Sequence, residues 1–188
     1  GADVVVVELD EHLLPALADV LAGDTEAALR HLPAAAAELR LAGSTAEALD
    51  LLAQQVQLFD QLPREERRRR ASEALQARQA AAEILVATDR WREASDAFLD
   101  LLGACRGAGD TAAEARALIG LGRTENLAGA HDEAREHLER ARELARSADD
   151  KRDEAAAMIS LVQTAYMSGK TEEAEALREP VLAAARAS

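Results

Sequence analysis

Apolar residues recur every three or four positions along most of this chain, which is the spacing of an amphipathic helix. The pattern is clearest between Glu114 and Leu144, where two striped segments flank the sequence Ala128-Gly129-Ala130. Glycine commonly ends a helix because it readily adopts a left-handed backbone. The stretch is therefore predicted to be a hairpin of two helices.

Small residues occupy the predicted crossing of this hairpin. Gly122 lies in the first helix and Ala134 in the second, and their size lets the two backbones approach closely. The turn recurs at 40-residue intervals, each time as Gly or Asp, four residues and then an alanine preceded by glutamate. The matching segments are Asp89 to Ala94, Gly129 to Ala134 and Gly169 to Ala174. Three matches at equal spacing indicate a true repeat.

The hairpin resembles the tetratricopeptide repeat. The residues that carry the resemblance are Leu121-Gly122, the turn residue Gly129, and Ala134 followed four residues later by Leu138. The resemblance implies an all-α, right-handed superhelix of helical hairpins with about nine helices. The 40-residue period exceeds the family's usual length of about 34 residues, so the helices are expected to be about one turn longer, or the loops looser.

The composition agrees with an all-helical fold. Apolar residues make up 48% of the 188 residues but aromatic residues only 2%, so the core must consist mainly of Leu, Ala, Val and Ile. The 10 Gly and 4 Pro lie nearly all at predicted breaks. Only Val4 to Val7 strongly favours a strand, and a single strand cannot form a sheet.

Residues 1–62 are expected to form an N-terminal segment of three helices. Pro15 predicts a kink in the first helix or a late start near Leu14. The next two helices are expected at about residues 24–41 and 45–62, because Gly followed by Asp, Ser or Thr stops one helix and caps the next.

Residues 63–70 are expected to form an irregular junction, since the repeat spacing is about six residues too long here and Pro63 disfavours helix. Residues 71–188 then hold about three hairpins. The last helix departs from the pattern, because Arg178 replaces the large apolar residue and Pro180 is expected to interrupt the helix. A terminal repeat that faces water is often atypical.

The junction also contains the run Arg67 to Arg70. The favoured interpretation is a solvated helix start, in which Glu65 and Glu66 pair with Arg69 and Arg70 at i,i+4 spacing. The alternative is a basic docking patch. The run covers every face of a helix and lacks aromatic neighbours on which bases would stack, which disfavours a nucleic-acid site.

The net charge of −13 argues against nucleic acid and anionic membranes as partners, because such a surface repels phosphate groups. The single cysteine, Cys105, excludes an internal disulfide and suits a reducing compartment. No signal peptide or membrane span is evident in the sequence. A cytoplasmic location is therefore expected.

No catalytic, metal or cofactor motif is evident. His131 and His137 flank Glu133, but they are six residues apart rather than the four of a zinc-protease helix, so they should face different ways as surface side chains. Cys105 lies among apolar residues with no nearby histidine, which indicates a core thiol. The chain is therefore expected to be non-catalytic and to need no cofactor or metal.

In tetratricopeptide repeats the first helix of each hairpin lines a concave groove that binds a partner segment. The resemblance implies that the groove-facing residues here are Gln76, Gln79, Glu83, Arg116, Ile119, Arg123, Asn126, Ile159, Gln163 and Tyr166. Arg116, Arg123 and Asn126 would suit a carboxylate or an acidic peptide. The family's carboxylate clamp uses Lys and Asn at several of these places, and Lys151 and Lys170 match none of them. Alternatively, the set is simply the solvated side of the first helices.

Two functions follow from this interpretation. The favoured one is a scaffold that binds a partner peptide, protein or neighbouring domain, similar to the sensor or regulatory regions of bacterial signalling proteins. The alternative is self-association, such as a homodimer, through Val4 to Val7 and the leucines that follow.

Overall fold

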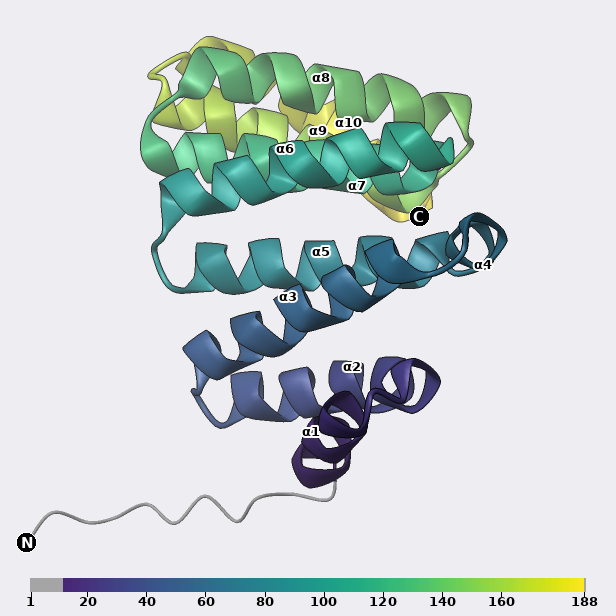
Figure 1. Cartoon of the computed structure of the whole chain (residues 1–188). Helices are drawn as coiled ribbons and strands as arrows, with labels where there is room; N and C mark the ends of the chain where they lie inside the picture. Colours follow the sequence, from purple (N-terminus) through teal and green to yellow (C-terminus); the bar gives the residue numbers. More distant parts are fainter. Residues whose placement is uncertain (1–11, 188) are drawn as a thin grey trace, which may run out of the picture. The chain divides into compact units, whose positions relative to one another are not determined.

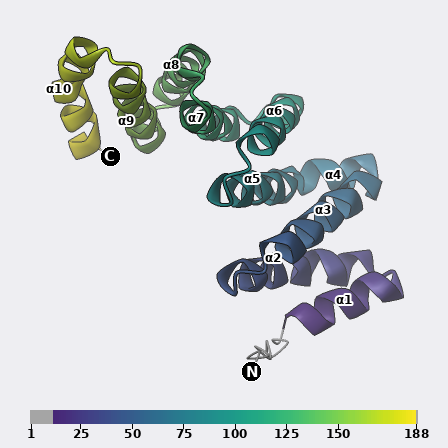
Figure 2. The ribbon, with the colours of Figure 1, turned by 90° about the vertical axis from the view of Figure 1, so that its left-hand side faces the viewer.

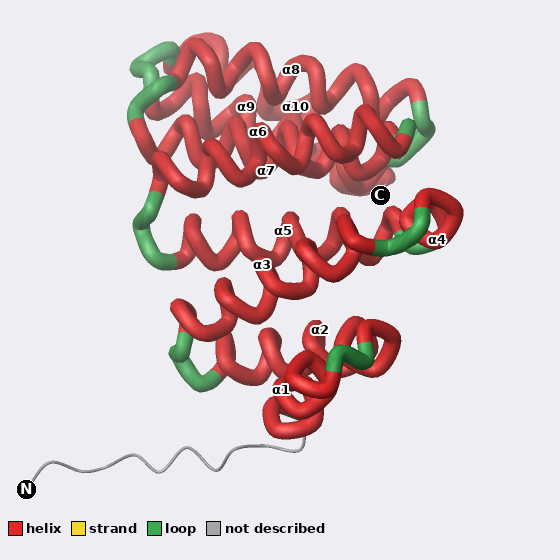
Figure 3. The backbone as a smooth tube through the Cα atoms, viewed as in Figure 1, coloured by secondary structure: helices red, strands yellow, loops and turns green. Residues whose placement is uncertain are grey.

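The computed structural model describes residues 12–187, and within this range it contains ten α-helices and no strand (Figures 1 and 3). The helices are α1 (Leu13–Ala22), α2 (Thr25–Leu41), α3 (Thr45–Gln61), α4 (Arg64–Arg69), α5 (Ala71–Ala87), α6 (Trp91–Ala108), α7 (Thr111–Ala128), α8 (His131–Ser147), α9 (Lys151–Met167) and α10 (Thr171–Ala187). The all-α prediction is thus confirmed.

Two prolines behave differently from one another. Helix α1 begins at Leu13, which is the late start that Pro15 predicts, since proline is tolerated in the first turn of a helix. Val4 to Val7 lie outside the described residues. Helix α10 continues through Pro180, so the expected interruption is wrong. Proline removes only one backbone hydrogen-bond donor, so the other backbone hydrogen bonds of this 17-residue helix can maintain the helix on both sides of Pro180.

The repeated turns have a common backbone geometry. Gly129 and Gly169 have φ angles of 84° and 77°, and Asp89 takes the same left-handed conformation with a φ of 58°. Glycine adopts this conformation without strain, and aspartate tolerates it better than most residues. The backbone thus explains why the 40-residue turn pattern accepts Gly or Asp.

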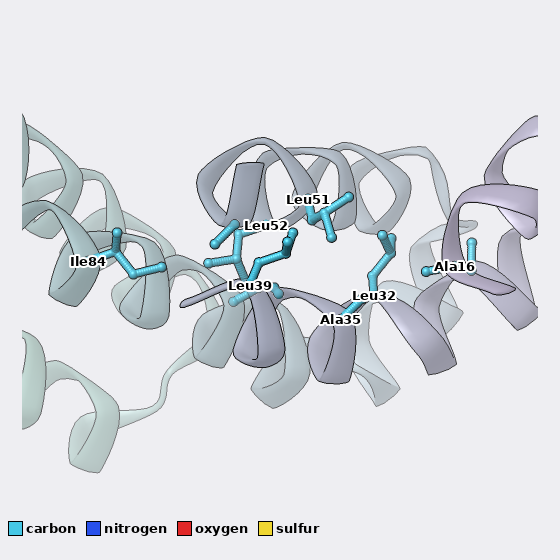
Figure 4. Packing of buried hydrophobic residues seen from close by; sticks show 11 residues of the cluster. Ala16, Leu32, Ala35, Leu39, Leu51, Leu52 and Ile84 are labelled. Carbon is cyan, nitrogen blue, oxygen red and sulfur yellow. The ribbon is translucent and has the colours of Figure 1, made fainter. Parts of the chain in front are cut away.

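The described chain divides into two compact units at Ile84 and Leu85, within α5. In unit 1, leucines and alanines of α2 and α3 form the core, joined by Ala16 of α1 and Ile84 of α5 (Figure 4). Ala16 and Leu32 are fully buried. The small side chains allow close packing of these helices, as the Ala-rich composition suggests.

Arg70 of unit 1 connects three helices. Its guanidinium lies 5.5 Å from the centre of the Phe59 ring, and it donates hydrogen bonds to Glu73 and, at 3.0 Å, to Glu26. The i,i+4 spacing predicts a pair between Arg70 and Glu66, and this prediction is wrong. Arg70 follows the last residue of the short helix α4, and its side chain reaches Glu73, Glu26 and the Phe59 ring instead. The predicted Glu65–Arg69 pair is present at 3.8 Å.

In unit 2 each helix packs against the next along the chain, and α7 also packs against α9 (Figure 2). Gly122 of α7 faces α8 so closely that a Cβ atom there would lie 2.6 Å from Leu138 Cγ and 3.1 Å from the carbonyl oxygen of Ala134. Gly120 meets the ring of Phe98 in the same way. The predicted close crossing at Gly122 and Ala134 is confirmed.

Candidate functional site

Helices α7 and α9 are the first helices of two successive hairpins in unit 2, and both are largely buried. Between the first and last residues of α7, the exposed residues are Arg116, Arg123 and Leu127. Their spacing of seven and four residues places them along one side of the helix. This helix therefore presents one narrow strip to solvent.

Helix α9 presents the equivalent strip. Gln163 and Met167 lie 40 residues after Arg123 and Leu127, and all four are exposed, as is Arg152 in the first turn. Leu127 and Met167 are each 51% exposed. Equivalent positions of stacked repeats face the same way, so the two strips form one surface. We call it the α7–α9 strip; its members are Arg116, Arg123, Leu127, Arg152, Gln163 and Met167.

Two predicted groove residues lie between the helices instead. Ile119 and Asn126 are buried, and the Asn126 amide donates a hydrogen bond of 2.7 Å to the Thr164 hydroxyl of α9. Thr164 in turn donates to the carbonyl of Ser160. These two residues join the repeats rather than line an open surface, because the side of α7 that carries them is the side on which α9 packs.

Ile159 and Tyr166 are the equivalents of Ile119 and Asn126 in the next repeat, and their exposure differs. Ile159 is 44% exposed against 8% for Ile119, and Tyr166 is 52% exposed against 4% for Asn126. Helix α9 covers this side of α7, whereas within the described chain no further first helix follows α9. Ile159 and Tyr166 therefore form an apolar edge beside the α7–α9 strip.

The remaining predicted groove residues belong to α5 of unit 1. Gln76 and Glu83 are exposed, and the half-buried Gln79 donates a hydrogen bond of 2.9 Å to Glu83. All three therefore present polar atoms at the surface of unit 1. Their role in binding stays a prediction, as does that of the strip residues.

Acidic side chains on α7 and α9 are all engaged by a base. The pairs are Glu114 with Arg106 at 2.8 Å, Glu125 with His137 at 2.9 Å, Asp153 with Arg116 at 3.5 Å, and Glu154 with Lys151 at 3.3 Å. Arg123 and Arg152 make no ion pair or side-chain hydrogen bond with the residues that the structure describes. The exposed charge on this surface is therefore positive.

Burial perturbs two of these carboxyl groups. Desolvation raises the pKa of Asp153 above its usual value, and Arg116 opposes this effect only in part. Desolvation likewise raises the pKa of Glu125, against the opposing hydrogen bond from His137. Asp153 pairs with Arg116 of α7 and Glu125 pairs with His137 of α8, so neither adds an exposed acid to the α7–α9 strip.

The structure corrects the expectation for the two histidines. His131 and His137 are half-buried rather than free at the surface: His131 Nδ1 lies 3.3 Å from Asn126 Oδ1, and His137 pairs with Glu125. Sequence spacing along α8 could not reveal their partners on α7. Among residues 12–187, no cluster of three or more His, Cys, Asp or Glu side chains could hold a metal ion.

Cys105 is a core thiol, as predicted. It is fully buried, and desolvation raises its pKa to about 11. A thiol with so high a pKa is mostly protonated at neutral pH and is a poor nucleophile. Across the part of the chain that the structure describes, no helix is long and apolar enough to cross a membrane.

Sequence reasoning missed Leu127, Arg152 and Met167 as surface residues of the candidate site. The signal was present, since Leu127 and Met167 each follow a predicted groove residue by four positions and are 40 residues apart. The repeat period, applied to exposed as well as core positions, would have found Leu127 and Met167, whereas Arg152 corresponds to Ala112 and has no such signal.

The family profile described as "Tetratricopeptide repeat" matches residues 73–147 and, in an overlapping register, residues 113–187. Together these matches cover more than half of the chain. The chain belongs to the tetratricopeptide repeat family, whose domains are typically protein-binding modules.

Solved structures share the fold at low sequence identity. BtubC from P. vanneervenii superposes with a TM-score of 0.77 at 14% identity, covering 96% of this chain and 75% of that one. Aspartyl phosphate phosphatase F from Bacillus subtilis gives a TM-score of 0.73 at 14% identity, covering 84% of this chain and 40% of the other. A Rap protein complexed with competence and sporulation factor gives 0.56 at 16% identity, with 91% and 52% covered.

The chain thus spans 40% of the phosphatase and 52% of the Rap protein. No curated protein matches the sequence. At these identities the similarity to solved structures establishes the fold and leaves the partner open.

Proposed function

We propose that this chain is a non-catalytic interaction scaffold that binds a partner peptide or protein through the α7–α9 strip. The observation that carries the proposal is the pair of exposed strips at equivalent positions of the first helices α7 and α9. In a repeat array the neighbouring helices cover most of each first helix. A ligand can therefore contact only the side that remains exposed. The strip combines charged, polar and apolar side chains, the mixture that a protein interface uses.

The relatives support this proposal by analogy of fold. One Rap protein of the same fold is complexed with competence and sporulation factor, so a stack of this kind can hold a ligand. We further propose a regulatory role within the cytoplasm, which suits the buried, protonated thiol of Cys105. The described residues offer no nucleophile paired with a base, and catalysis has no place in the proposal.

The test is capture of the partner from native lysate, followed by mass spectrometry. The wild-type chain is compared with Arg116→Glu/Arg123→Glu on the strip and with Arg140→Glu/Arg146→Glu on α8. The four arginines are exposed, so both double variants carry the same charge change at solvated positions.

We expect a protein recovered by the wild type and by the α8 variant but lost with the strip variant. Recovery that is equal in all three would contradict the assignment of the strip. Circular dichroism of each variant establishes that the helices remain intact.

Self-association is the second candidate, because α1 exposes an apolar face. Leu14, Leu17 and Leu21 are exposed and follow one another at helical spacing. Exposed leucines aligned on one helix favour contact with another apolar surface. If a second copy covers them, light scattering will show a dimer that Leu14→Glu/Leu21→Glu converts to a monomer. A wild-type monomer at all concentrations would eliminate this candidate.

A further inference from the structure

We propose that the occupant of the α7–α9 strip is an acidic segment of a partner protein that also carries apolar side chains. This inference rests on the proposed function and adds the chemistry of the ligand. It follows from how charge is divided between the first and second helices of unit 2.

The first helices expose only positive charge. Arg116, Arg123, Lys151 and Arg152 are exposed on α7 and α9, whereas every acid on these two helices is at least half-buried and paired with a base. This arrangement stands out in a chain whose net charge is −13. An acidic ligand is therefore attracted to this surface although the chain as a whole repels it.

The second helices carry the opposite charge. Their exposed acids are Asp132, Glu133, Glu136, Glu139 and Glu143 on α8, and Glu172, Glu175 and Glu179 on α10. Among the residues of α8 and α10 whose side chains the structure describes, up to Leu182, the exposed arginines are fewer: Arg140, Arg146 and Arg178. An acidic ligand is consequently disfavoured on α8 and α10, so that this charge division selects one face of unit 2.

Within the strip, the guanidinium groups of Arg123 and Arg152 are exposed to solvent. Arg123 and Arg152 have no ion pair or side-chain hydrogen bond to break among the described residues. Arg116 already contacts Asp153 at 3.5 Å and can share its remaining donors. A guanidinium binds a carboxylate through two parallel hydrogen bonds, which gives both affinity and orientation.

Apolar side chains share the strip with these arginines, and Leu127 follows Arg123 by one helical turn. Leu127 and Met167 are half-exposed near the C-terminal ends of α7 and α9, and Tyr166 is exposed next to Met167. A purely acidic ligand would leave these three side chains in water, and a purely apolar ligand would cover arginines without pairing them. The surface therefore favours a segment that offers both carboxylates and apolar groups.

The probe is a library of random 12-residue peptides displayed on phage and selected against the full chain. We expect the recovered sequences to be enriched in Asp and Glu together with Leu, Ile, Phe or Tyr. The most enriched peptide is then synthesised with a fluorophore, and its affinity is measured by anisotropy at low and high salt. Binding should weaken with salt, because the strip is solvated.

Variants locate the binding. Arg123→Glu/Arg152→Glu should raise the Kd of the synthetic peptide about tenfold or more, since it removes charge-assisted hydrogen bonds to the carboxylates and adds two repelling charges. Arg140→Glu/Arg146→Glu on α8 is the matched control and should bind as the wild type does. Replacing every Glu of the peptide by Gln, or every apolar residue by Ser, should weaken binding in each case.

The outcomes separate this inference from the proposed function. Selection of neutral or basic peptides that no longer bind Arg123→Glu/Arg152→Glu would refute the acidic ligand but keep the strip as the binding surface. Acidic peptides that bind the strip variant and the wild type equally would overturn both. Failure to enrich any sequence above an unselected library would also count against both.

Discussion

Replacing Gly122 by alanine tests the close crossing of α7 and α8. At a solvent-exposed position within a helix, this change stabilises the folded protein by about 1 kcal/mol, because alanine restricts the unfolded chain and favours helix. Here the new Cβ would lie 2.6 Å from Leu138 Cγ and 3.1 Å from the carbonyl oxygen of Ala134. The first is the branching atom of a fully buried side chain and the second belongs to the backbone, so neither can move aside freely.

Overpacking of a core typically costs about 1–3 kcal/mol. At so short a distance we expect the upper part of this range, which exceeds the gain in helix propensity. Gly122→Ala should therefore destabilise unit 2 by about 1–2 kcal/mol, measured by urea unfolding. Fluorescence of Trp91 reports on the correct unit, because it is the single tryptophan of the chain and lies in α6.

Gly103→Ala is the matched control. Gly103 lies within α6 of the same unit, and apart from the adjoining residues and backbone of its own helix no atom lies within 4 Å of the position that its Cβ would take. We expect this substitution to stabilise by about 0.5–1 kcal/mol, the opposite sign. A Gly122→Ala protein as stable as Gly103→Ala would refute the proposed crossing.

A double-mutant cycle identifies the clashing atom. Leu138→Ala alone should cost about 2–5 kcal/mol, as other truncations of buried leucine do. In the Gly122→Ala background the same truncation also relieves the contact, so its cost should be smaller by at least about 0.5 kcal/mol. Strictly additive effects would contradict contact between the two side chains.

Three further measurements test the packing of unit 2. Asn126→Ala should cost about 1–3 kcal/mol, because it removes the buried hydrogen bond to Thr164, whereas exposed Gln163→Ala should change the stability by less than about 0.5 kcal/mol. Cys105 should react with iodoacetamide at pH 8 at least about 100-fold faster in urea than in the native protein, since it is buried with a pKa of about 11; equal rates would contradict its burial. Burial raises the folded pKa of Asp153, so its contribution to stability falls as the pH rises through the interval between its unfolded and folded pKa values. The free energy of unfolding of Asp153→Asn, relative to that of the wild type, should therefore be higher at pH 7 than at pH 4. A difference in unfolding free energy that does not change with pH would show that the pKa of Asp153 is not raised.

Much of the fold could be predicted from the sequence because its signals are local. Helical spacing of apolar residues, turn residues and the 40-residue period all act within one hairpin. The observed helices α2 and α3, at Thr25–Leu41 and Thr45–Gln61, differ from the expected ranges by one residue at one end of each. Gly122 was recognisable as a crossing point because small residues at matched positions on two helices have few other causes.

The candidate site was harder to predict, because exposure depends on which neighbour covers each helix. Asn126 and Tyr166 are equivalent in sequence register, yet one is buried beneath α9 and the other is exposed. The ion pair between Arg116 and Asp153 joins residues on different helices, and nothing in the local pattern indicates it. The repeat period predicts which positions correspond, whereas the number of stacked repeats decides which of them remain accessible.

The most direct test of the proposed binding face is photo-crosslinking with the fluorescent peptide selected above. A photoreactive amino acid is placed at Gln163 on the strip or at Glu139 on α8, two exposed positions in the same unit. We predict a covalent peptide adduct from the protein modified at Gln163, suppressed by excess unlabelled peptide, and none from the protein modified at Glu139. An adduct at Glu139 of equal or greater yield would contradict binding to the α7–α9 strip.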